Sequence, residues 1–231
     1  MSDSPTIWFD RRPAPELAEL APAEANIEWP QSDDPLDGID RADGVIAGAS
    51  IIYDQTVFAL ASKLRVLVRA GIGFDNIVLD DATDAGVAAC NTPDGPTIST
   101  AEHALALIFS VTKGLQQSAN RLQRQEGNYG ASHNALELDG ARLTLIGLGR
   151  IGSRVAKVAT AAGIQVTAYD PFESDERFEA LGVTRSSDLG EAVSEAQIVS
   201  IHAPLSSKTR HLVDSNLIGR MRDGVFIVNT A

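Results

Sequence analysis

The chain has 231 residues, 44% of them hydrophobic, and its 31 Asp and Glu against 19 Lys and Arg give a formal net charge of −12. This length supports one large or two modest domains. The lack of any basic stripe argues against a nucleic-acid partner. Acidic residues are spread along the chain, which favours an ordinary self-repelling surface and leaves salt adaptation as the alternative.

Cys90 is the only cysteine, so an internal disulfide is impossible and a reducing compartment fits best. It lies in the apolar run "VAAC", where we expect a small buried filler. The N-terminus "MSDSPTIWFD" has neither a basic segment nor a long apolar stretch. We therefore expect no signal peptide, no membrane partner and a cytoplasmic location.

Short apolar runs alternate with helix-like segments over the first part of the chain. Strands are expected at 6–9, 26–29, 44–49, 66–71 and 87–91, with helices in "APELAEL", "TVFALAS" and "NIVLDDATDAG". Continuous apolar runs indicate strands buried on both faces of a parallel sheet. Residues 1–97 are thus predicted to form one small doubly wound α/β domain.

The segment "STAEHALALIFSVTKGL" predicts a helix over about 100–115, capped by Ser99 or Thr100. Its middle is apolar on nearly every side, which indicates a helix enclosed between domains or subunits. The polar, Gly-containing segment 123–140 reads as a connecting loop.

The alternation resumes at Arg142 and predicts a second α/β unit, so that the second domain covers 98–231. Strands are expected at 142–147, 165–170, 198–202 and 225–230, with a short one at 183–185 and a helix from Ile151 to about Ala162. These strands are fewer than a six-stranded nucleotide domain requires.

The stretch "LTLIGLGRIGSRVAKVA" holds Gly147, Gly149 and Gly152 in a G-x-G-x-x-G pattern between an apolar run and a helix. In such a turn the first glycine permits a tight bend and the second lets the backbone approach a pyrophosphate. The third allows close packing of helix and strand. Amides of Arg150 and Ile151 at the helix N-terminus favour an anion. The pattern predicts a dinucleotide cofactor.

Asp170 ends the next expected strand, about 20 residues beyond the glycines, where a carboxylate accepts hydrogen bonds from both ribose hydroxyls. The same carboxylate would repel a 2′-phosphate, so NAD is favoured over NADP. The alternative is that Asp170 merely starts the turn "DPF".

The segment "IHAPLSSKTRHL" begins at the end of another expected strand. Ligands of open α/β sheets lie outside the carboxyl ends of the strands, which places His202, Ala203 and Pro204 at the cofactor rim and lets Thr209 reach a phosphate or ribose. His202 could instead be a strand-end histidine bonded to backbone.

Four segments together resemble the D-isomer-specific 2-hydroxyacid dehydrogenases: "VRAGIGFDNIVLDDATDAGVAACNTP", "STAEHALAL", "LTLIGLGRIGSRVAKVA" with "AYDPF", and "IVSIHAPLSSKTRHLVDSNLIGRMRDGVFIVNTA". The resemblance covers about Arg65 to Ala231, whereas residues 1–64 share only the alternating pattern. It implies a flavodoxin-like substrate domain, a Rossmann NAD-binding domain that is incomplete here, and hydride transfer between NAD and a D-2-hydroxy or 2-keto acid.

The resemblance also assigns roles to residues. Backbone amides of Ile72 and Gly73 match those that hold the substrate carboxylate, although an ordinary tight turn capped by Asp75 or Asn76 is the alternative. Thr100 matches the position that packs against the nicotinamide. Further cofactor contacts match Arg150, Ile151, Asp170, Pro204, Thr209 and Thr230. Ala141 and Tyr129 depart from the family, which more often has Lys and Trp there.

In the family the motif "NTA" is followed by an arginine that clamps the substrate, then by a Glu and a His that serve in acid/base catalysis. None of His103, His133 and His211 has a carboxylate at a telling spacing. We therefore assign no catalytic residue within 1–231 and expect a truncated chain that is inactive alone.

Arg69 is the only cation close to the expected carboxylate site, which favours a small unphosphorylated acid over phosphoglycerate. The resemblance also implies a homodimer through the helix at 100–115. An NAD-binding sensor or scaffold similar to the C-terminal-binding corepressors is the alternative function. A formate- or phosphite-type dehydrogenase is the third.

Overall fold

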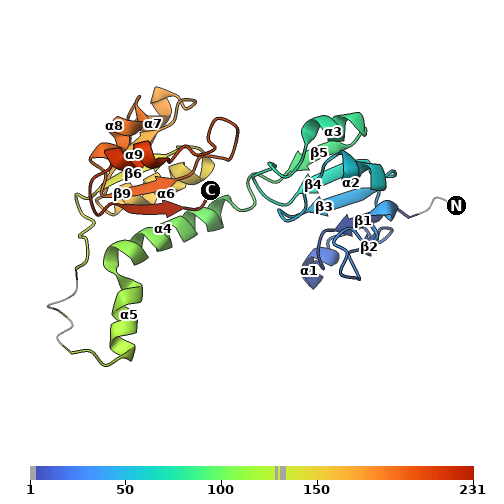
Figure 1. Ribbon diagram of the computed structural model, residues 1–231, viewed down its shortest axis with the longest axis horizontal. Coiled ribbons are helices and arrows are strands. Elements are labelled where there is room, and N and C mark those ends of the chain that lie inside the picture. The colour runs from blue at the N-terminus through green and yellow to red at the C-terminus, as the bar shows by residue number, and fades with distance from the viewer. Residues whose placement is uncertain (1–3, 128–129, 131–133) are drawn as a thin grey trace. The chain divides into compact units, whose positions relative to one another are not determined.

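The computed structural model describes residues 4–127, 130 and 134–231. The chain divides into two compact units, Met1–Pro96 and Thr97–Ala231. Each unit is an α/β layer structure around its own parallel sheet (Figure 1). Among the described helices none is both long and apolar enough to cross a membrane.

The first unit contains a five-stranded sheet in the order β2-β1-β3-β4-β5, and all of its strand pairs are parallel. This is the flavodoxin-like doubly wound order, with its switch point between β1 and β3. The strands are β1 Thr6–Phe9, β2 Asn26–Glu28, β3 Gly44–Ala47, β4 Val66–Arg69 and β5 Ala88–Asn91.

The helices of the first unit are short: α1 Pro15–Ala18, the 3-10 helix η1 Ile39–Arg41, α2 Gln55–Leu60 and α3 Leu79–Asp84. Asp54 begins α2 by accepting hydrogen bonds from the amides of Thr56 and Val57, as expected of an N-cap aspartate. The core gathers around Trp8, Tyr53 and Leu67, each with none of its surface exposed.

The second unit contains a five-stranded parallel sheet in the order β10-β9-β6-β7-β8. Counted within the unit, this is 5-4-1-2-3, the doubly wound nucleotide-binding order without its sixth strand. The strands are β6 Arg142–Ile146, β7 Gln165–Tyr169, β8 Thr184–Arg185, β9 Ile198–Ile201 and β10 Phe226–Asn229. The predicted α/β class with two doubly wound parallel sheets is confirmed.

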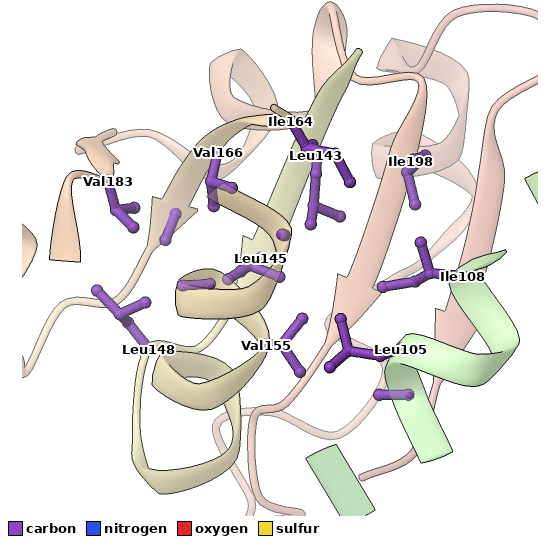
Figure 2. Close-up of a cluster of buried hydrophobic side chains, with 14 of the residues drawn as sticks. Leu105, Ile108, Leu143, Leu145, Leu148, Val155, Ile164, Val166, Val183 and Ile198 are labelled. Atoms are coloured by element: carbon purple, nitrogen blue, oxygen red, sulfur yellow. The ribbon is translucent and has the colours of Figure 1, made fainter. Parts of the chain in front are cut away.

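Helices cover both faces of the second sheet. The helices of this unit are α4 Thr97–Lys113, α5 Leu115–Gln123, α6 Arg150–Ala161, α7 Asp175–Leu181, α8 Leu189–Ser194 and α9 Ser215–Arg220, of which α5 extends away from the sheet (Figure 1). On one face Leu105 and Ile108 of α4 and Val155 of α6 meet Leu145 and Ile198 from the strands (Figure 2). A smaller cluster under α8 and α9 buries the other face, so these strands are apolar on both sides.

Three details differ from the sequence predictions. Helix α4 begins at Thr97, so Ser99 and Thr100 lie inside its first turn and do not cap it. Cys90 is exposed, because β5 is an edge strand whose alternate residues face solvent. Helix α5 was not predicted, since its nine residues are mostly polar and none of them is buried.

Candidate functional site

The turn between β6 and α6 depends on two glycines. Gly147 has φ of +100°, and a Cβ there would lie 2.9 Å from the carbonyl carbon and oxygen of His202. A Cβ on Gly152 would overlap the carbonyl oxygen of Gly147. The first glycine therefore permits a positive φ at the turn, and the third lets the helix contact the turn closely, as the motif predicts.

Gly149 differs from both, because a Cβ built on it would meet no atom within 4 Å. It is the N-cap residue of α6, a 12-residue helix whose first-turn amides have no acceptor within the helix. These amides carry the positive end of the helix dipole. The open space over Gly149 thus fits the pyrophosphate of a dinucleotide, which a side chain would exclude.

Asp170 follows β7 and lies beside the same turn. One of its oxygens, Oδ2, accepts a hydrogen bond from the amide of Leu148 at 2.8 Å, and Oδ1 accepts one from the amide of Phe172 at 2.9 Å. The second bond forms the local turn that is the alternative explanation for Asp170. The first bond joins the carboxylate to the glycine turn, and contact with a ribose stays a prediction. Each oxygen retains acceptor capacity for a ribose hydroxyl.

His202 follows β9 on the neighbouring strand, at the point where the strand order reverses. Its Nε2 lies 2.9 Å from Oγ of Ser200, and burial lowers the pKa of His202 to about 4. Two buried polar atoms here have no partner among the described residues: His202 Nδ1 and Oγ1 of Thr230, which follows β10. Orphaned buried polar groups are rare and frequently mark functional positions.

The remaining predicted rim residues lie in the loop after β9. Ala203 is half-buried and Pro204 exposed. Thr209 is turned toward this loop, because its Oγ1 donates to the carbonyl of Pro204 at 2.5 Å and accepts from the amide of Ser206 at 2.8 Å. Thr100 is half-buried in α4, while Arg150 and Ile151 occupy the first two positions of α6.

Ser200 was missed by the sequence analysis. A signal for it existed, since residues two apart on a strand face the same side, and the pattern Ser-x-His therefore brings the two side chains together. Thr144 is also buried, but its hydroxyl donates a hydrogen bond to the carbonyl of Ala192 and does not contribute to the turn.

The turn after β4 belongs to the first unit. Gly71 has φ of +152°, and the amides of Ile72 and Gly73 have no acceptor within the part of the chain that the structure describes. Consecutive free amides in a turn are the donors of which an anion-binding nest is built, so the predicted carboxylate site stays a prediction that this geometry allows. Asn76 does not cap the turn, because its Nδ2 donates to the carbonyls of Gly48 and Ile51, at 3.1 and 2.7 Å.

The described histidines other than His202 are poor candidates for acid/base work. His103 and His211 are exposed, and His211 has φ of +58°. Neither makes an ion pair with a carboxylate in the described chain. His133 and Tyr129 lie outside the described residues. Ala141 is buried just before β6.

Comparisons with known proteins point to one family. Residues 105–231 match the family described as "D-isomer specific 2-hydroxyacid dehydrogenase, NAD binding domain". The chain is 36% identical over 198 residues to the D-3-phosphoglycerate dehydrogenase of Bacillus subtilis (strain 168), a match that covers 86% of this chain and 37% of the relative. It is also 33% identical over 230 residues to that of Mycobacterium tuberculosis (strain ATCC 25618 / H37Rv), covering 98% and 43%.

Solved structures agree. A D-lactate dehydrogenase from Aquifex aeolicus, complexed with NAD and lactic acid, superposes with a TM-score of 0.84 at 26% identity, covering 98% of this chain and 68% of that one. A formate dehydrogenase from Granulicella superposes with a TM-score of 0.79 at 25% identity, covering 89% and 56%. The chain spans about two fifths of the length of the curated relatives that it matches.

The match covers more than half of the chain, and it begins within α4 and includes the glycine turn, Asp170 and the strand ends around His202 and Thr230. The open space over Gly149, and the unpaired buried atoms of His202 and Thr230 after the neighbouring strands β9 and β10, fit the dinucleotide that the family's domain binds. The chain belongs to the D-isomer-specific 2-hydroxyacid dehydrogenase family, and its second unit is the NAD-binding domain of that family.

Proposed function

We propose that the whole protein is an NAD-dependent oxidoreductase that interconverts a D-2-hydroxy acid and a 2-keto acid. The observation that carries this proposal is the turn over Gly149, open above α6 and joined through Leu148 to the carboxylate of Asp170. Bound NAD supplies or accepts the hydride. The helix amides hold its pyrophosphate, and Asp170 orients the adenosine ribose and disfavours a 2′-phosphate.

The first unit would hold the substrate. The carboxylate of the acid fits the amides of Ile72 and Gly73, which lack other acceptors in the described chain. Arg69 is the nearest cation in sequence, and its Nη1 already donates to the carbonyl of Ala70. The Nε of Arg69 is buried without a partner among the described residues, so one cation with one bonded nitrogen stands at this turn. A single cation suits a carboxylate better than a carboxylate and a phosphate together, and a small unphosphorylated 2-keto acid is the substrate class that we propose. The phosphoglycerate dehydrogenases among the relatives make a phosphorylated acid the alternative to test.

Acid/base catalysis would come from outside residues 1–231. The described part of this chain offers no histidine paired with a carboxylate at either site, and the curated relatives are more than twice as long as the match. A positioned acid typically contributes about 10²–10⁴-fold to the rate. Residues 1–231 alone are therefore expected to bind NAD without turning over a keto acid.

The test compares two proteins. Isothermal titration of residues 1–231 with NADH should give saturable binding that NADPH reproduces at least about tenfold more weakly. The full-length protein should oxidise NADH with one or more members of a panel of glyoxylate, hydroxypyruvate, pyruvate and 3-phosphohydroxypyruvate. Absence of saturable NADH binding by both proteins would refute the proposal, and turnover of the phosphorylated acid alone would refute the substrate class.

We further propose a homodimer through α4 and α5. Helix α5 has no buried residue and contacts α4, and it exposes Leu115 (54%) and Leu122 (75%). Val111 of α4 is also 39% exposed. Apolar side chains on an unpartnered helix are typical of a subunit contact. Sedimentation at micromolar concentration should give twice the chain mass, and a Leu122→Lys variant should give the mass of one chain.

A further inference from the structure

The end of β5 is tied to the substrate turn by a reciprocal pair of hydrogen bonds. The amide of Gly71 donates to Oγ1 of Thr92 at 2.8 Å, and the amide of Thr92 donates back to the carbonyl of Gly71 at 3.0 Å. The Thr92 amide also lies 3.2 Å from the carbonyl of Arg69, the last residue of β4. Residue 71 is thus held through both of its backbone polar groups.

The preceding residue of β5 holds the next position of the turn. Nδ2 of Asn91 donates to the carbonyl of Ile72 at 2.8 Å. Arg69 and Asn91 are register partners at the carboxyl ends of the neighbouring parallel strands β4 and β5. Residues 91 and 92 therefore leave the sheet beside residues 70–73 and can bond to successive groups of the turn.

Together these bonds use the amide of Gly71 and the carbonyls of Gly71 and Ile72. They leave the amides of Ile72 and Gly73 without an acceptor in the described chain. Each peptide unit is planar, so holding the carbonyls of Gly71 and Ile72 also fixes the direction of the amides of Ile72 and Gly73, which belong to the same peptide units. The clamp from β5 fixes which donors remain available before a ligand binds.

We propose that Thr92 and Asn91 are positioning residues that preset the nest of Ile72 and Gly73 for the carboxylate of the substrate. This inference rests on the proposed function. Neither side chain touches the substrate in this arrangement, and both act through the turn. Their effect is to reduce the ordering that substrate binding would otherwise require.

The test uses oxamate, an unreactive 2-keto acid analogue, titrated into residues 1–231 with NADH present and followed through the amide NMR signals of Ile72 and Gly73. Thr92→Val keeps the side-chain shape and removes Oγ1, which is one of two acceptors of the Gly71 amide; the other, the carbonyl of Arg69 at 2.9 Å, remains. The substitution should raise the Kd for oxamate about tenfold, equivalent to ~1.4 kcal/mol, since one hydrogen bond to the turn is lost. Thr92→Ser keeps the hydroxyl and should restore the Kd to within about twofold.

Thr83→Val is the matched control, because Oγ1 of Thr83 also bonds to a backbone group of the first unit, the carbonyl of Leu79 at 2.8 Å, but in α3. It should leave the Kd for oxamate unchanged. Amide exchange in the free wild-type protein gives a second readout that needs no variant: the Gly71 amide should exchange more slowly than those of Ile72 and Gly73.

Three outcomes would overturn the inference. An unchanged Kd in Thr92→Val, with Ile72 and Gly73 still responding to oxamate, would reject the clamp and leave the nest standing. Equal weakening in Thr83→Val would reduce the effect to general destabilisation. A wild-type protein that binds NADH but shows no response of Ile72 and Gly73 to oxamate would remove the nest itself and the proposed substrate site with it.

Discussion

The glycine turn allows effects on cofactor binding to be separated from effects on folding. Gly149→Ala places a methyl group in the space where no atom lies within 4 Å, so nothing in the protein resists it. Gly152→Ala places the same group against the carbonyl oxygen of Gly147, with the carbonyl carbon only 3.1 Å away. The two substitutions are chemically identical and lie within one turn of the same helix.

The two substitutions are expected to change different quantities, the Kd for NADH in one case and the free energy of unfolding in the other. Gly149→Ala exchanges one N-cap residue for a poorer one, a cost of at most ~1 kcal/mol in the free energy of unfolding. The methyl group would displace the pyrophosphate and weaken about two hydrogen bonds to an anion, so the Kd for NADH should rise about 100-fold. Gly152→Ala overpacks a backbone contact that cannot yield, which should cost ~3 kcal/mol and lower the Tm by roughly 6–12 °C.

Thermal unfolding without ligand and titration with NADH, both on residues 1–231, measure the two quantities independently. Each variant should fail mainly in one assay: Gly149→Ala in binding and Gly152→Ala in stability. If Gly149→Ala binds NADH as tightly as the wild-type protein, the dinucleotide does not lie over this turn, and the assignment of the pyrophosphate site to Gly149 is wrong.

Two further substitutions test the groups around the turn. Asp170→Ser removes the carboxylate beside Leu148 and should shift the ratio of NADPH to NADH affinity at least about tenfold toward NADPH, as measured by competition titration; an unchanged ratio would dissociate Asp170 from ribose recognition. His202 has its pKa lowered to about 4 by burial. The unfolded chain therefore takes up its proton first as pH falls below about 6.5, and the folded protein loses on the order of 3 kcal/mol of stability by about pH 4. The difference in unfolding free energy between the wild-type protein and His202→Gln should shrink over that window when denaturant titrations are compared; a pH-independent difference would mean that His202 is not buried in its neutral form.

The fold class was predictable because the strands of the second unit are apolar on both faces. Leu143, Leu145 and Ile198 are each at most 1% exposed, and continuous runs of that kind indicate central parallel strands. Which strand lies at the edge of a sheet was not predictable from apolar runs. Cys90 lies in an equally apolar run, but β5 has a neighbour on one side only, and pairing order is a property of the whole sheet.

The site was predictable where function is local in sequence. Gly147, Gly149 and Gly152 lie within six residues, and the spacing alone indicates a turn that the structure shows. The clamp of the nest was not predictable, because Gly71 and Thr92 are 21 positions apart and meet only through the register of β4 with β5. A Thr that accepts a backbone amide leaves no distinctive pattern in a single sequence.

The two sites that we propose would hold their anions in the same way. The chain has a net charge of −12, and neither turn contains a cluster of lysines. In each case the strand alongside takes up the first amides of the turn. The carbonyl of Tyr169 and the carboxylate of Asp170 bind the amides of Gly147 and Leu148, and Thr92 binds that of Gly71. The amides that follow keep their dipoles for a ligand. Fixed backbone dipoles attract an anion at close range without changing the net charge that repels other copies of the protein.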